Sequence, residues 1–141
     1  MKKRLRLSLL PVATLLLEIL PYGAALNFAR PAADGSIGYV RSLCSYFDPL
    51  PFGYANFAPL ITAVLTCVLL LLTAGYAATG RRGWKIAARN LSAVCALVSL
   101  CPLLLGIRFY SVVGGLITAT LLAEFLCLRA ALSPAGDTPE E

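Results

Sequence analysis

The chain has 141 residues, of which 59% are apolar and only 13% charged, and its formal net charge is +5. Soluble domains carry about a quarter charged residues, so a water-soluble core of this size is excluded and lipid is the expected solvent. The basic residues flank apolar runs instead of alternating with aromatics along one face, which argues against nucleic-acid binding.

Two residue types limit the chemistry. Histidine is absent, which removes histidine-based nucleophile systems and histidine metal sites. No two of the five cysteines have the C-x-x-C spacing of zinc or thiol-redox motifs. We therefore expect no enzyme activity, no metal and no cofactor.

Four apolar segments each come close to the ~20 residues that cross a bilayer as a helix. They cover residues 7–28, 57–78, 86–105 and 112–132. Lipid cannot satisfy an open backbone, so all four are predicted to be helices of one all-α domain over residues 1–132. A cleaved signal peptide is the rival reading of the first segment, which its length and the interrupting Glu18 disfavour.

The distribution of Lys and Arg predicts the orientation. With the N-terminus inside, nine basic residues lie on the cytoplasmic side and three on the outer side. The inner set is Lys2, Lys3, Arg4, Arg6, Arg81, Arg82, Lys85, Arg89 and Arg129, and the outer set is Arg30, Arg41 and Arg108. This predicts a multi-pass protein of the cell membrane with both termini in the cytoplasm. The polar tail 133–141 is predicted to be disordered.

The first outer loop, residues 29–56, is long and rich in aromatics. Apolar residues recur at helical spacing from Ile37 to Phe47, before Asp48-Pro49. This predicts a short amphipathic helix at the membrane interface. The loop is either a lid or partner surface, or a segment that only seals the bundle.

Glu18 lies near the middle of the first segment, where a charge costs at least ~2.5–3.5 kcal/mol on insertion scales. It is therefore expected to face the bundle interior. Thr14 and Tyr22 lie four residues to either side, on the same helix face. Thr62 and Thr66 of the second segment can complete a polar binding cluster. Two readings remain open: a proton or cation site, and an acid that bonds helices together.

Arg89 and Glu124 form the second candidate set. Both are expected in the inner leaflet on adjacent antiparallel segments. An ion pair, or Arg89 reaching a lipid phosphate, would lower their cost, so a structural ion pair is predicted.

Two runs carry a resemblance. The runs LEILPYGAALNF (17–28) and SYFDPLPFGYANF (45–57) resemble those of small four-helix bacterial membrane proteins of unknown function. The resemblance covers most of the chain and implies a helical membrane bundle without implying an activity. Glu18 in the first helix is also similar to the glutamate of small multidrug resistance transporters, although the long aromatic loop departs from their short loops.

These observations predict a structural or accessory membrane protein that acts through helix–helix contacts. Its partners would be the lipid bilayer and either itself or another membrane protein, and no nucleic acid. The alternative is a small proton-coupled transporter that uses Glu18.

Overall fold

The computed structural model describes residues 7–33, 35–49 and 56–132 of the chain. Within these residues it contains four α-helices, one 3-10 turn and a two-stranded sheet. The helices are α2 (Leu9–Ile19), α3 (Ala58–Thr79), α4 (Arg82–Leu104) and α5 (Val112–Leu132), with η1 (Ile107–Phe109) between the last two. The strands are β1 (Ala24–Pro31) and β2 (Ile37–Cys44).

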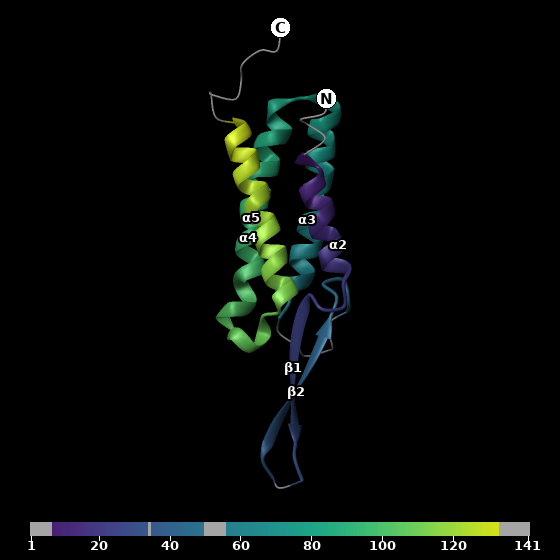
Figure 1. Ribbon diagram of the computed structural model, residues 1–141, viewed down its shortest axis with the longest axis vertical. Coiled ribbons are helices and arrows are strands. Elements are labelled where there is room, and N and C mark those ends of the chain that lie inside the picture. The colour runs from purple at the N-terminus through teal and green to yellow at the C-terminus, as the bar shows by residue number, and fades with distance from the viewer. Residues whose placement is uncertain (1–6, 34, 50–55, 133–141) are drawn as a thin grey trace.

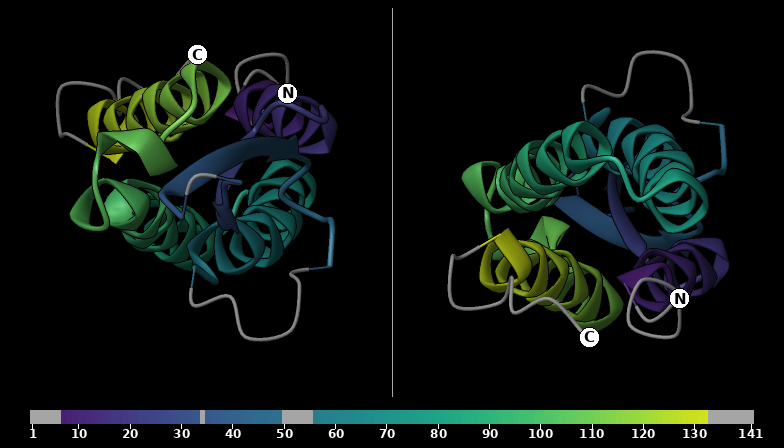
Figure 2. Two further views of the ribbon diagram at one scale, coloured as in Figure 1. Left: turned by 90° about the horizontal axis from the view of Figure 1, so that it is seen from below. Right: turned by 90° about the horizontal axis from the view of Figure 1, so that it is seen from above.

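The helices form a bundle in which each packs on two neighbours, in the cyclic order α2, α3, α4, α5 (Figures 1 and 2). The start of α2, the α3–α4 turn and the end of α5 lie at one end of the bundle. The two strands project beyond the opposite end (Figure 1). Three helices, α3, α4 and α5, are long and apolar enough to cross a membrane. The expected tail at 133–141 lies outside the described residues.

Local chemistry fixes the ends of the long helices. Gly80 adopts a left-handed conformation with φ 67° and donates its N–H to the Tyr76 carbonyl at 2.8 Å, which ends α3. Helix α4 begins at Arg82, about one turn earlier than expected, and so includes Lys85. Helix α5 has the expected range.

The first segment is not one long helix, so the prediction of a helix over 7–28 is wrong. Helix α2 ends at Ile19, and Leu20 is extended with ψ 138°. Pro21 explains this end, because a proline disfavours helical conformation in the preceding residue and itself lacks an N–H. The 11 residues of α2 give a length of about 16 Å, roughly half of a bilayer's hydrocarbon core.

The predicted interfacial helix over 37–47 is also wrong, because this stretch belongs to a β-hairpin. Strand β2 pairs antiparallel with β1, so that Val40 lies opposite Phe28. Its turn is closed by the Ala32 N–H, which donates to the Ser36 carbonyl at 2.8 Å, and by Gly35 at φ 79°. Ile37 and Val40 are β-branched residues that favour a pleated strand. The all-α description therefore holds for the bundle alone.

Candidate functional site

Glu18 lies at the junction of α2, α3 and the hairpin. Its side chain is completely buried, at 0% exposure. The Thr66 hydroxyl lies 2.8 Å from Glu18 Oε1 and 3.0 Å from the Thr62 carbonyl oxygen, while Oε2 has no partner among the described residues. A hydroxyl has one proton to donate. If Thr66 donates to its own helix, only a protonated Glu18 can complete the second bond.

The main chain of Glu18 holds the hairpin. Its carbonyl oxygen accepts hydrogen bonds from the Tyr46 N–H at 3.0 Å and from the Ser45 hydroxyl at 2.8 Å. One residue thus contacts α3 through its carboxyl group and the end of β2 through its backbone.

The side chains of the other predicted members of the cluster do not bond to Glu18. The Thr14 hydroxyl lies 2.9 Å from the Thr120 hydroxyl of α5, and Thr62 donates to the Ala58 carbonyl at 2.8 Å. Tyr22 is 57% exposed, because α2 ends before it and the four-residue spacing no longer applies. The structure therefore brings Glu18 to Thr66 but not to Tyr22.

Arg89 and Glu124 do not form the predicted direct ion pair. Glu124 is 0% exposed, and neither of its carboxyl oxygens has a hydrogen-bond partner in the described part of the chain. Arg89 instead donates to the Asn90 side-chain oxygen at 2.8 and 3.2 Å. The physical reason is helix rotation, since Glu124 shares the buried face of α5 with Leu121 and Leu128 while Arg89 is half-exposed.

The two buried acids flank a bond between helices. Thr14 and Thr120 lie at one level of the antiparallel helices α2 and α5. Glu18 lies one turn beyond Thr14 toward the hairpin, and Glu124 lies one turn beyond Thr120 in the opposite direction. At 1.5 Å per residue, the two carboxyl groups are separated by about 12 Å along the bundle axis.

Hydroxyl groups continue this polar interior toward the hairpin. Thr118 of α5 lies 2.8 Å from the Ser99 hydroxyl of α4 and 2.6 Å from the Tyr110 hydroxyl. These three residues were not predicted from the sequence. The sequence did contain one signal for this polar interior, which is the seven-residue spacing of Ser92 and Ser99 on one face of α4. Both residues are buried.

The base of the hairpin is anchored to the α4–α5 connection. The Asn27 amide donates to the Arg108 carbonyl at 3.0 Å, and the Arg41 guanidinium donates to the Tyr110 carbonyl at 3.1 Å. The Ser111 hydroxyl also donates to the Gly23 carbonyl. These bonds fix the hairpin as it leaves the bundle.

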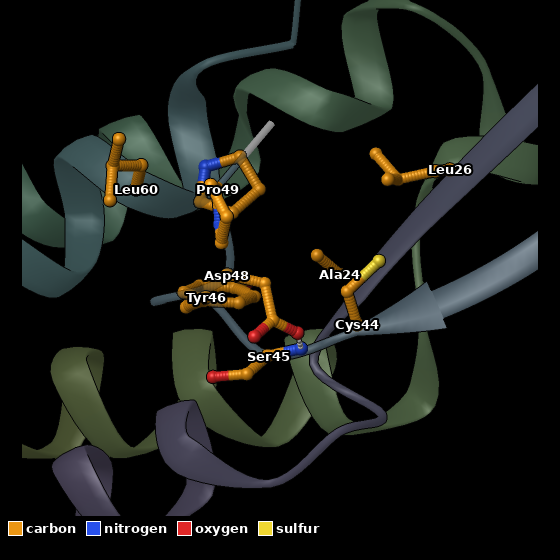
Figure 3. A pocket seen from close by; sticks show the side chains of 9 residues that line it. Ala24, Leu26, Cys44, Ser45, Tyr46, Asp48, Pro49 and Leu60 are labelled. Carbon is orange, nitrogen blue, oxygen red and sulfur yellow. Dashed lines mark hydrogen bonds between the residues drawn. The ribbon is translucent and has the colours of Figure 1, made fainter. Parts of the chain in front are cut away.

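A small cavity lies beside this base, between the ends of the strands and the start of α3 (Figure 3). Tyr46 is buried there, and the Asp48 carboxylate accepts the Ser45 N–H at 2.7 Å. Burial, with smaller contributions from Tyr110 and Glu18, raises the pKa of the Tyr46 phenol. The volume of ≈ 10 Å³ holds roughly one water molecule. It is therefore too small for an organic ligand.

Searches of protein-family models, curated proteins and solved structures found no match to this chain. Among the described residues, no three Cys, Asp or Glu side chains gather in a way that could hold a metal ion.

Proposed function

We propose that this chain is an accessory protein of the cell membrane that acts by contact, through its β-hairpin, with another membrane protein or a second copy of itself. The exposure of strand β2 carries the proposal, since every residue from Ile37 to Leu43 is exposed. Ile37 is 68% exposed and Tyr39 64%.

Physical chemistry makes such a hairpin a poor free-standing element. An isolated two-stranded ribbon is at best marginally stable in water. The bonds that tie this one to the bundle involve Asn27 and Arg41, nearer its base than the paired ends Pro31 and Ile37. A partner that covers the projecting part would bury its apolar side chains and stabilise it.

The ribbon offers a partner two kinds of contact. Side chains alternate along a strand, so Ile37, Tyr39 and Leu43 point to the same face of β2. A two-stranded sheet also has two edges, and an edge can pair with an extended segment of another chain. Either contact uses the hairpin while the helices stay in lipid.

The orientation of the chain in the membrane is part of this proposal. Helices α3, α4 and α5 cross the membrane, and α2 inserts beside them with its first turn on the cytoplasmic side. The nine-to-three distribution of basic residues supports cytoplasmic termini and an external hairpin.

Site-specific photo-crosslinking tests this function. A benzoylphenylalanine in place of Tyr39 should give a protein adduct of one discrete mass, both in native membranes and, if the partner is a second copy, with the purified chain. The same probe in place of Leu71, which is exposed on α3, is the matched control and should react with lipid. Ile37→Ser should abolish the Tyr39 adduct without changing the fold. A Tyr39 probe that gives only the pattern of the Leu71 control would reject the proposal.

A second candidate function, a small proton-coupled transporter, is favoured by one observation. Glu18 and Glu124 are fully buried and leave three carboxyl oxygens without partners among the described residues. Such groups in a membrane interior are commonly parts of ion or proton paths.

Proton flux into liposomes distinguishes the two functions. If Glu18 carries a proton, Glu18→Gln should fold normally and abolish flux driven by a membrane potential. If the chain acts only by contact, the wild-type protein should show no flux above that of protein-free liposomes.

A further inference from the structure

The end of the bundle opposite the hairpin carries an open groove between α4 and α5. Its volume is ≈ 390 Å³, and it is lined by Arg89, Arg129, Ala130 and Leu132. Arg89 lies about 10 Å from the start of α4, and Arg129 about 4–5 Å from the end of α5. In ~30 Å of hydrocarbon, helices of this length place Arg129 near the polar headgroup layer and Arg89 deeper, where its long side chain can extend toward that layer.

Neither guanidinium is paired with an acid in residues 7–33, 35–49 and 56–132. Arg89 bonds only to the amide oxygen of its neighbour Asn90, which leaves its remaining N–H groups without a partner in that part of the chain. The nearby Glu124 faces the interior. Within the described residues, the groove therefore presents two positive charges, from two different helices, that no acid neutralises.

Below the groove the helix surfaces are apolar. Leu126 and Leu122 follow Arg129 on α5 at spacings of three and seven residues, and Leu97 follows Arg89 on α4 at eight. All three leucines are exposed. Leu122 and Leu126 share the helix face of Arg129, so this arginine stands above an apolar stripe, and the exposed Leu97 lies about two turns below Arg89 on α4.

We propose that this groove binds the phosphate of an anionic phospholipid, with Arg89 and Arg129 on the phosphate oxygens and the acyl chains along the exposed leucines of α5 and α4. The guanidinium fork matches phosphate geometry and can bond two oxygens at once. Basic pockets between transmembrane helices bind acidic headgroups in this way. The exposed leucines favour a lipid over a free phosphate ion, because only a lipid supplies chains to cover them.

Lipid retention in mixed nanodiscs, counted by native mass spectrometry, tests the site. The full chain is placed in phosphatidylcholine containing phosphatidylglycerol as the probe. Wild type should retain phosphatidylglycerol selectively, and R89Q/R129Q should bind it at least ten-fold more weakly. The pair R81Q/R82Q removes the same charge from the same end but outside the groove, and should change affinity less than two-fold.

Each other outcome overturns the inference. If R89Q/R129Q and R81Q/R82Q lose the same amount of affinity for phosphatidylglycerol, diffuse surface charge attracts the lipid. Equal retention of both lipids by wild type would mean that no selective site exists, and this measurement stands even if R89Q/R129Q fails to fold. A rise in Tm with inorganic phosphate alone that equals the rise with phosphatidylglycerol, both measured in neutral detergent, would identify a free-anion site instead.

Discussion

Replacing Glu124 by leucine is expected to stabilise this protein, although it removes an acidic side chain from the interior of the bundle. The carboxyl group is completely buried, and neither oxygen has a hydrogen-bond partner in the described structure. A buried polar group without a partner costs about 1–3 kcal/mol. Leucine has a similar volume and fits the apolar face that Glu124 shares with Leu121 and Leu128.

We therefore expect Glu124→Leu to raise the free energy of unfolding by about 1–3 kcal/mol. Glu124→Gln leaves a polar group in the same place and should change it by less than about 0.5 kcal/mol. Glu18→Leu is the matched comparison at the other buried acid. Its loss of the Thr66 bond offsets the removal of the unpaired Oε2, so the net change should be close to zero.

The assay is reversible unfolding in mixed micelles, followed by circular dichroism at increasing denaturant. The effects of Arg89→Gln and Glu124→Leu on the free energy of unfolding should add without coupling, because the two side chains do not pair. A loss of more than about 1 kcal/mol in Glu124→Leu would refute the reasoning. It would mean that water or a cation bound in the interior satisfies the carboxyl group.

Three further predictions concern the contacts between elements. Thr14→Val removes the α2–α5 bond to Thr120 and should lower the free energy of unfolding by about 0.6 kcal/mol, measured in the same micelles. Gly23→Ala places a Cβ 2.9 Å from Tyr46 Cδ1, so it should cost about 1–3 kcal/mol and release the hairpin to limited proteolysis. Because burial raises the pKa of Tyr46 above the ordinary value of 10, the folded state keeps its proton longer than the unfolded state, and stability should fall as pH rises above 10. Tyr46→Phe should remove that contribution to the decline, and an unchanged pH profile would show that the phenol is not responsible.

The long helices were predictable because apolar length and glycine stops determine them locally. Residues 112–132 and the stop at Gly80 needed no knowledge of neighbouring segments. The face of Glu18 was equally predictable, since a buried acid seeks hydroxyl groups and Thr62 and Thr66 share one helix face.

The hairpin was missed because two patterns competed in the same residues. Apolar spacing between Ile37 and Phe47 fits a helix, but Asp34-Gly35 is a common hairpin turn sequence that joins two stretches able to pair. Pro21 similarly marks a helix end inside a run whose apolar composition alone predicts continuation.

The isolation of Glu124 was not predictable from the sequence. Its depth follows from its position, but the rotation of α5 about its own axis depends on how all four helices pack. A rotation that places Leu121 and Leu128 inside also places Glu124 inside and away from Arg89. A prediction of charge pairing that uses only the depth of two residues in the membrane ignores the rotation of each helix about its axis.

The double role of Glu18 has a mechanical consequence. Its carbonyl oxygen holds the start of the turn after β2, while its carboxyl group holds the middle of α3. A pull on the projecting hairpin would be shared between its bonds to the α4–α5 connection and the last turn of α2, and through the Glu18 side chain it would also reach the middle of α3. Tension large enough to move the last turn of α2 would lengthen the Thr66 contact, so the hairpin and the buried acid are mechanically coupled through Glu18.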